Sequence, residues 1–144
     1  MKMKIPVIKH PGAALIVPFI EKDKVILLRQ FRPVIGRYLY ELPAGTREEG
    51  ESLLSCARRE LAEETGYSAS GIARLGYIYP VPGYSTEKIV IYRACGLKKS
   101  GGHPEKDEVI RCGIAGKAMV RKLFLSGKIN DAKTICAFSI CGWL

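Results

Sequence analysis

Runs of apolar residues alternate with short polar turns through the first third of the chain. Two such runs, AALIVPFI and KVILLRQF, are joined by the charged turn EKDK, and this pattern predicts a β-hairpin over residues 13–31. A third segment, RYLYEL, alternates in polarity and predicts a short strand that ends at Pro43. Later β-like runs predict strands over residues 72–79, 87–97 and 108–115.

The remaining periodic segments predict helices. One runs from Glu51 to Thr65 and is stopped by Gly66, a residue that favours helix C-termini. Two more are expected over residues 116–127 and 131–143, the second with Asp131 as its N-terminal cap. Strands, a helix, more strands and then helices indicate a single α/β (α+β) domain over residues 1–144, with a mixed β-sheet covered by helices.

Composition is that of a folded globular protein. The chain has 144 residues, of which 47% are hydrophobic and 26% are charged. This balance excludes an intrinsically disordered chain. No apolar run approaches the roughly 20 residues needed to span a bilayer, and no apolar stretch of signal-peptide length precedes the first prolines. We therefore expect a cytoplasmic protein with no membrane partner.

The net charge of +9 changes the picture little, because the basic residues are spread along the chain. One mild cluster lies in KKSGGHPEK, with Lys98, Lys99, His103 and Lys106. Such charge suits nucleic acid, and it suits a polyanionic small substrate such as a diphosphate equally well. Composition alone does not separate these two partners.

Five cysteines, at positions 56, 95, 112, 136 and 141, form no C-x-x-C pair. Most fall inside apolar or periodic segments, so we expect them to be small buried side chains in a reducing compartment. The two histidines lack a matching cysteine pattern, and zinc is therefore not expected.

The helix over residues 51–65 carries an unusual acidic group, Glu60, Glu63 and Glu64. At about 100° per residue, Glu60 and Glu64 fall at the margin of the apolar stripe rather than opposite it. That stripe is expected to contain Leu53, Leu54, Ala57 and Leu61. Carboxylates at a core boundary are costly to desolvate unless they are paired or bind a metal. The spacing alone leaves both explanations open: ion pairs with the neighbouring arginines, or a Mg²⁺ site.

The spacing around this helix resembles a known signature. Gly45, five residues, Glu51, seven residues and then RELAEETGY match the Nudix box of the Nudix hydrolase superfamily at its fixed polar and glycine positions. The one departure is Tyr67, where an aliphatic residue is usual. The resemblance implies a Nudix-type α/β/α sandwich with a mixed β-sheet, in which the box forms a loop, a helix and a loop.

The resemblance also implies roles for individual residues. Metal ligands for Mg²⁺ or Mn²⁺ would be Glu60, Glu63, Glu64 and the backbone carbonyl of Ala44. Glu51 and Arg59 would form a pair that shapes the box. The implied chemistry is substitution at a diphosphate phosphorus by a metal-activated water.

Segments outside the box, QFRPVIGRYLYELPAG and YPVPGYSTEKI, resemble the ADP-ribose and nucleoside-diphosphate-sugar pyrophosphatase branch. We expect substrate contacts from Arg29, Arg32, Pro82 and Tyr84, because arginine offers forked donors and an aromatic ring can stack on a base. In this branch an acidic loop can provide a base or an additional metal ligand, and Glu108 is the residue expected to do so here.

The predicted function is therefore divalent-metal-dependent hydrolysis of the diphosphate bond of ADP-ribose or a related nucleotide sugar. Two alternatives stay open: a Nudix pyrophosphohydrolase for nucleoside triphosphates or dinucleoside polyphosphates, and a non-catalytic nucleotide-sensing Nudix domain. Nucleic acid is not the expected partner, because a pure binder need not retain all the box glutamates. Members of the branch commonly dimerise through an extra N-terminal β segment; little chain precedes Ala13 here, which leaves a homodimer open.

Overall fold

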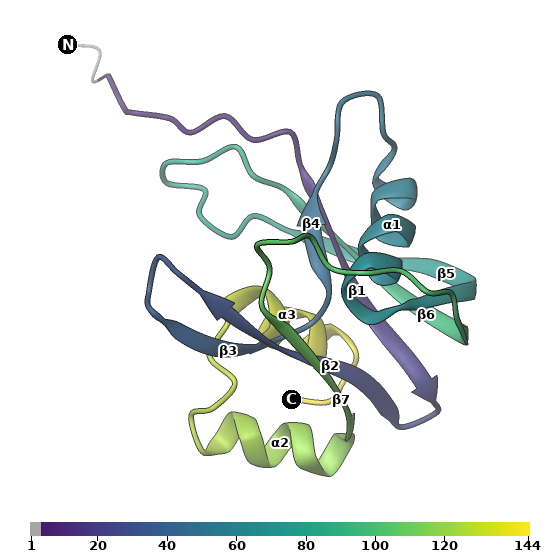
Figure 1. The fold of residues 1–144 in the computed structure, drawn as a ribbon. Helices are drawn as coiled ribbons and strands as arrows, with labels where there is room; N and C mark the ends of the chain where they lie inside the picture. The colour runs from purple at the N-terminus through teal and green to yellow at the C-terminus, as the bar shows by residue number, and fades with distance from the viewer. Residues whose placement is uncertain (1–3) are drawn as a thin grey trace.

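The computed structural model describes residues 4–144, and apart from the short strand β4 the elements in this range follow the order expected from the sequence. In chain order they are β1 (Ala13–Glu21), β2 (Lys24–Arg32), β3 (Arg37–Glu41), β4 (Ala44–Thr46), α1 (Leu53–Thr65), β5 (Tyr67–Ile78), β6 (Ile89–Lys99), β7 (Ile110–Gly116), α2 (Lys117–Leu125) and α3 (Ala132–Ile140). The chain thus has the mixed sheet and covering helices that the pattern predicted (Figure 1).

Strand β1 is the centre of the sheet. Its first part runs parallel to β6, with Ala13 opposite Ile89, and antiparallel to β4. Its last part forms the expected hairpin with β2, which then pairs antiparallel with both β3 and β7. Strand β5 completes the other edge beside β6. The box strand β4 and the start of β1 therefore lie side by side at the middle of the molecule.

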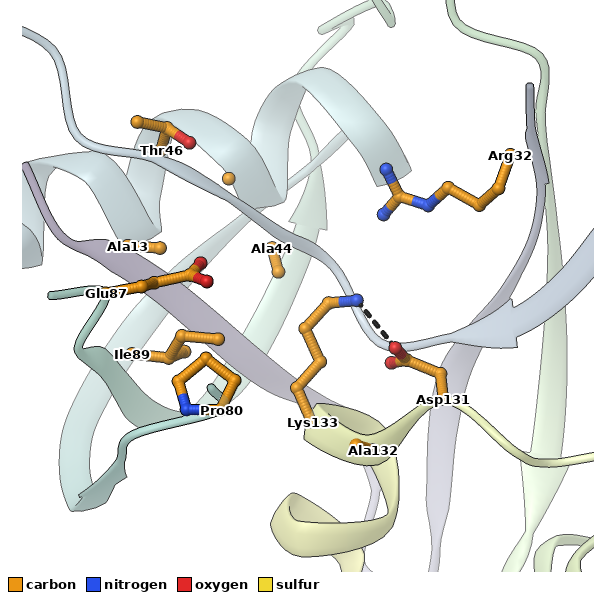
Figure 2. Close-up of a pocket in the computed structure, with 11 residues that line it drawn as sticks. Ala13, Arg32, Ala44, Thr46, Pro80, Glu87, Ile89, Asp131, Ala132 and Lys133 are labelled. Atoms are coloured by element: carbon orange, nitrogen blue, oxygen red, sulfur yellow. Dashed lines mark hydrogen bonds and ion pairs between the residues drawn. The ribbon is translucent and has the colours of Figure 1, made fainter. Parts of the chain in front are cut away.

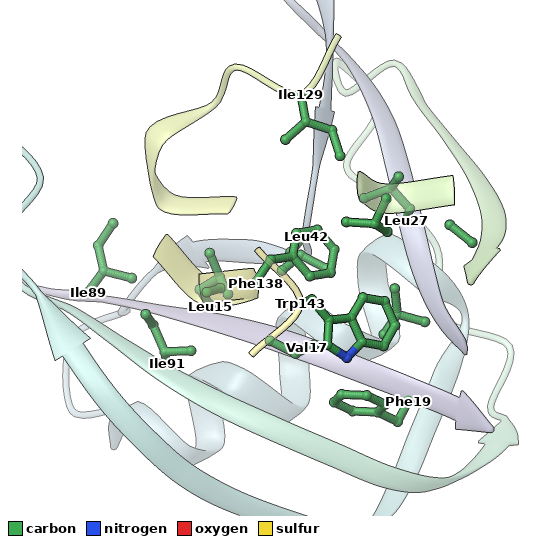
Figure 3. Close-up of a cluster of buried hydrophobic side chains, with 14 of the residues drawn as sticks. Leu15, Val17, Phe19, Leu27, Leu42, Ile89, Ile91, Ile129, Phe138 and Trp143 are labelled. Carbon is green, nitrogen blue, oxygen red and sulfur yellow. The ribbon is translucent and has the colours of Figure 1, made fainter. Parts of the chain in front are cut away.

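Both faces of β1 are buried, which explains its continuous apolar run. Successive side chains of a strand point to opposite faces. Ala14 and Ile16 belong to a cluster that includes Leu61 of α1. Leu15 and Val17 belong to a second cluster under α3 (Figure 3). One helix on one face and the C-terminal helices on the other confirm the predicted α/β/α arrangement.

Aromatic side chains close the second cluster at the C-terminus. Trp143 stacks on Phe138 with ring centroids 5.5 Å apart and meets Phe19 edge to face at 5.7 Å. Both aromatic residues of this C-terminal pair are buried. Such packing adds to the stabilisation from burial alone, and it fixes α3 against the sheet.

Several predicted boundaries need correction. Strand β5 begins at Tyr67, well before the expected start, because its polar YSASG segment is held by pairing with β6. Strand β7 begins at Ile110 rather than at residue 108. The three-residue β4 was not expected at all. The caps of two helices are confirmed, since Gly66 adopts φ 76° after α1 and the Asp131 side chain accepts a hydrogen bond at the start of α3.

The buried face of α1 is also rotated from the expected one. Leu54 is 42% exposed, whereas Cys56 is fully buried. The helix turns its Glu60 and Glu64 side toward the sheet, which moves Leu54 outward. The expectation of buried cysteines holds for Cys56 but is wrong for Cys95 and Cys112, which lie in exposed positions on their strands.

Within residues 4–144, no helix combines the length and the apolar character needed to cross a membrane.

Candidate active site

Helix α1 presents its carboxylates to the sheet because both of its ends are fixed locally. The Ser52 hydroxyl accepts a hydrogen bond from the Ser55 N–H at 3.1 Å and caps the N-terminus. Gly66 ends the helix in the left-handed conformation that glycine adopts without strain. At the neighbouring strand, any side chain at Gly45 would overlap the Glu60 carboxylate. The box glycines therefore allow the helix to approach β4 closely.

Arg59 is the centre of an ion-pair cluster. Its guanidinium donates to both oxygens of Glu51, at 2.9 and 3.0 Å, and to Glu60 at 2.7 Å. It also donates to Glu63 at 3.2 Å and to the carbonyl oxygen of Thr46 at 3.1 Å. One arginine thus ties the loop before α1, the helix and β4 together. The structure brings Glu51 and Arg59 together as the resemblance implied.

The same contacts shift the pKa values of Glu51 and Arg59 in opposite directions. Hydrogen bonds from Arg59 and from the Glu48 N–H lower the pKa of Glu51 to about 2. The hydrogen bonds that Arg59 donates to Glu51, opposed by burial, hold the pKa of Arg59 above its ordinary value. Glu51 is therefore a carboxylate fixed as an anion, which suits a shaping role.

Glu60 and Glu64 have the opposite behaviour. They are 8% and 3% exposed. Burial raises the pKa of Glu60 to about 7, although Arg59 opposes the change. Burial and the charge of Glu60 raise the pKa of Glu64 to about 9, against the hydrogen bond that the Ala44 N–H donates to it at 3.0 Å. The positive charge near these two carboxyl groups is too small to compensate for their burial.

They open into a cavity of about 290 Å³, which we call the carboxylate pocket. Its lining residues are Gln30, Arg32, Ala44, Gly45, Thr46, Glu48, Arg59, Glu60, Glu63, Glu64, Glu105 and Glu108. Six glutamates face two arginines. Glu108, on the loop before β7, is brought to the pocket as expected, and burial raises its pKa.

The donor chemistry of this pocket fits a hard divalent cation. It offers carboxylate oxygens in excess over positive charge, some of them buried, and Mg²⁺ prefers such oxygen ligands. Across residues 4–144, no three Asp, Glu, His or Cys side chains are already arranged to enclose a metal. Glu60 and Glu63 both reach toward Arg59 instead. The residues that would hold a cation are thus present, with Arg59 as their present counter-charge.

A second cavity of about 350 Å³ adjoins the first, and we call it the side pocket (Figure 2). The two share Arg32, Ala44, Gly45 and Thr46. The residues that line only the side pocket are Ala13, Pro80, Glu87, Ile89, Asp131, Ala132 and Lys133. This wall mixes cations, carboxylates and apolar groups, so it can contact a ligand that carries hydroxyl groups as well as charge.

Arg32 lies where the pockets meet, and Glu41 holds it there. Its Nε and Nη2 donate to the two carboxylate oxygens of Glu41 at 2.8 and 3.0 Å. Burial lowers the pKa of Arg32, but these hydrogen bonds and the charge of Glu41 outweigh it and keep the pKa above its ordinary value. Arg32 is therefore a fixed cation at the entrance to both pockets.

The other expected substrate contacts are not brought to these pockets. Arg29 lies on the opposite face of β2, where its guanidinium is 4.8 Å from the ring centroid of Tyr38. Pro82 and Tyr84 are exposed in the loop after β5, and Pro80 of the same loop lines the side pocket instead. Gln30, buried on the Arg32 face of β2, was missed because a neutral amide gave no charge signal.

Known proteins of similar sequence match this chain over most of its length. The chain is 33% identical over 136 residues to an ADP-ribose pyrophosphatase from Bacillus subtilis (strain 168), covering 93% of this chain and 74% of that protein. It is 34% identical over 136 residues to a methanol dehydrogenase activator from Bacillus methanolicus, with the same coverage of 93% and 74%.

Among solved structures, the crystal structure of an ADP compounds hydrolase superposes with a TM-score of 0.82 at 27% sequence identity. The match covers 90% of this chain and 70% of that one. A family model for the NUDIX domain matches residues 9–121, which include the whole of the box. The chain belongs to the Nudix hydrolase family.

Proposed function

We propose that this protein hydrolyses the diphosphate bond of ADP-ribose or a related nucleoside diphosphate sugar. The observation that carries the proposal is the junction of two pockets at Arg32. The carboxylate pocket supplies the acid-rich site, and the side pocket supplies mixed polar and apolar walls beside it. A substrate with a diphosphate in its middle and a sugar at one end fits this pair of cavities better than one that ends in phosphate.

In this proposal Glu60, Glu63 and Glu64 hold Mg²⁺ or Mn²⁺, with the Ala44 carbonyl as a further ligand. When bound, such a cation neutralises phosphate oxygens, acidifies a water molecule and stabilises the leaving group. Family members are typically dependent on a divalent metal, and the relatives named as ADP-ribose pyrophosphatases support the substrate class.

The other residues act by position and charge. Arg59 and Glu51 keep the box loop against α1. Arg32 directs a guanidinium nitrogen toward the phosphate that lies between the pockets. Glu108, whose pKa is raised by burial, accepts a proton from water or adds a carboxylate to the cation site.

Product analysis tests the proposal. Purified protein is incubated with Mg²⁺ or Mn²⁺ and with ADP-ribose, other nucleotide sugars, dinucleoside polyphosphates and nucleoside triphosphates. We expect ADP-ribose or another nucleotide sugar to be cleaved at the diphosphate, giving AMP and ribose 5-phosphate in the case of ADP-ribose. Cleavage restricted to triphosphates or dinucleoside polyphosphates, or binding of nucleotides with no cleavage, would contradict it.

A further inference from the structure

Glu41 of β3, which holds Arg32 in place, also contacts a second cation. Its side chain is only 1% exposed, and it lies behind the wall of the side pocket. A buried carboxylate is costly unless its charge is compensated. The residues that compensate it show what it does.

Two cations from distant parts of the chain meet at this carboxylate. Arg32, at the end of β2, binds both oxygens. Lys133, in the first turn of α3, donates to Oε1 at 2.6 Å. Both cations line the side pocket, and Figure 2 shows them reaching into it from separate elements. Glu41 therefore fixes the distance between two positive groups that face one cavity.

The geometry leaves hydrogen-bond donors for a ligand. Glu41 takes Nε and Nη2 of Arg32, and within residues 4–144 the Nη1 of this pocket-lining side chain has no hydrogen-bond partner. Lys133 has three N–H donors, of which Glu41 and Asp131 take two, the latter at 2.9 Å. Asp131 in turn caps α3 through the Thr134 N–H at 3.2 Å. This cap fixes the first turn of α3 and therefore the backbone position of Lys133.

We propose that Glu41 is a positioning residue of the side pocket. It holds Arg32 and Lys133 so that the remaining N–H groups of these two cations bind oxygen atoms in the sugar phosphate half of the substrate. This inference rests on the proposed function for the identity of that ligand. The arrangement of Glu41, Arg32 and Lys133 does not depend on it. Preorganised donors lower the cost of ordering side chains on binding.

The first test is Glu41→Gln, which keeps the size of the side chain and removes its charge. We expect KM for the best diphosphate substrate to rise about tenfold while kcat changes less than about threefold. Glu21→Gln, which removes one partner of the exposed pair with Lys24, is the matched control and should change neither constant. A purely structural role predicts a lower melting temperature with KM unchanged, and that result would overturn the proposal.

A double-mutant cycle shows whether Glu41 acts through its partners. Lys133→Met alone should raise KM by a similar factor, and Glu41→Gln with Lys133→Met should raise it by less than the product of the two single effects. Independent, multiplicative effects would contradict the inference. Lys133 is partly exposed, so its substitution leaves a measurable protein even where Glu41→Gln folds poorly.

The kinetic assay uses the nucleotide that the wild type cleaves best. This choice tests the positioning role of Glu41 separately from the proposed nucleotide-sugar function. A triphosphate as best substrate would end the nucleotide-sugar assignment, and the KM comparison would still test Glu41. A second readout needs no activity: acylation of lysines, measured by mass spectrometry. Lys133 should react more slowly than the exposed Lys122 in the wild type and several-fold faster in Glu41→Gln. Unchanged labelling of Lys133 would overturn the positioning role.

Discussion

The carboxylate pocket and the side pocket share a wall but differ in charge balance. Six glutamates and two arginines line the first. The second has two cations, Arg32 and Lys133, and two carboxylates, Glu87 and Asp131. Buried acids without enough positive charge take up protons or a cation, whereas a balanced set is stable as it stands. The difference separates a site suited to metal chemistry from a site suited to recognition.

The two ion-pair clusters behind these pockets show the same contrast. One guanidinium, Arg59, serves Glu51, Glu60 and Glu63. In the other cluster one carboxylate, Glu41, serves two cations. Removing the central residue therefore has opposite consequences: loss of Arg59 frees negative charge, and loss of the Glu41 charge frees positive charge. The following predictions test this comparison, beginning with the largest effect.

The largest effect is expected for Glu64→Gln, which keeps the shape of the side chain and removes a carboxylate from the acid-rich site. Turnover with Mg²⁺ should fall at least about 100-fold, because the proposed cation site loses a ligand charge. Folding should be little affected, because the amide can still accept the Ala44 hydrogen bond. Glu49→Gln, on the exposed loop before α1, is the control. Wild-type turnover in Glu64→Gln would show that the cation assignment is wrong.

Arg59→Ala should reduce both stability and rate. It leaves Glu51, Glu60 and Glu63 without their shared partner, and breaking such a cluster costs about 3 kcal/mol of unfolding free energy. Arg58→Ala is the matched control, since that arginine is exposed and its one hydrogen bond within residues 4–144 is to the Ala69 carbonyl at 3.3 Å. Thermal melts and steady-state kinetics measure the two effects. Equal losses in both variants would remove the special role of Arg59.

Arg32→Ala should affect binding more than chemistry. It removes the cation at the junction of the pockets, and we expect KM for ADP-ribose to rise about tenfold, equivalent to roughly 1.4 kcal/mol. The change in kcat should be smaller, because contacts remote from the reacting bond contribute mainly to selection among substrates. Arg29→Ala, on the opposite face of β2, is the control. A kcat loss larger than the KM change would place Arg32 in the chemical step instead.

The last prediction is a pH dependence of stability without metal. The folded-state pKa values of Glu60, about 7, and Glu64, about 9, lie above the ordinary value near 4.3 for an unfolded chain. Between the unfolded and the folded pKa values, the folded protein therefore binds more protons than the unfolded chain. Its free energy of unfolding falls as pH rises from about 5 to about 9.

Thermal melts at several pH values, after removal of divalent ions by a chelator, measure this effect. The decrease in melting temperature should be shallower in Glu64→Gln than in the wild type, and Mg²⁺ should restore more stability at pH 9 than at pH 6. An identical slope in wild type and Glu64→Gln would show that Glu64 ionises normally.

Local chemistry explains why much of the fold was predictable from the sequence. Continuous apolar runs on either side of a charged turn indicated β1 and β2. Gly66 and Asp131 marked helix ends through their own backbone and hydrogen-bonding preferences. By contrast, β4 has only three residues and exists because it pairs with β1. Strand β5 likewise depends on β6 for its polar start. Tertiary pairing leaves little trace in a single sequence.

The site shows the same division. The box glutamates and the Glu51–Arg59 pair lie close in sequence, and their spacing indicated them. Lys133 and Glu41 are 92 residues apart, so only the fold brings them together. Alternation along β2 was an unused signal: positions 29 and 32 cannot face the same side of one strand. Counting two residues back from Arg32 would have placed Gln30, rather than Arg29, on the pocket side of β2.

The most direct test of the central claim compares two substrates on one preparation. With saturating Mg²⁺, kcat/KM is measured for ADP-ribose and for ATP, and a chelator must abolish both activities. The combination of an acid-rich site with an adjoining side pocket predicts a clear preference for ADP-ribose, at least about tenfold. A higher kcat/KM for ATP would contradict the assignment of the side pocket to a sugar and, with it, the proposed function.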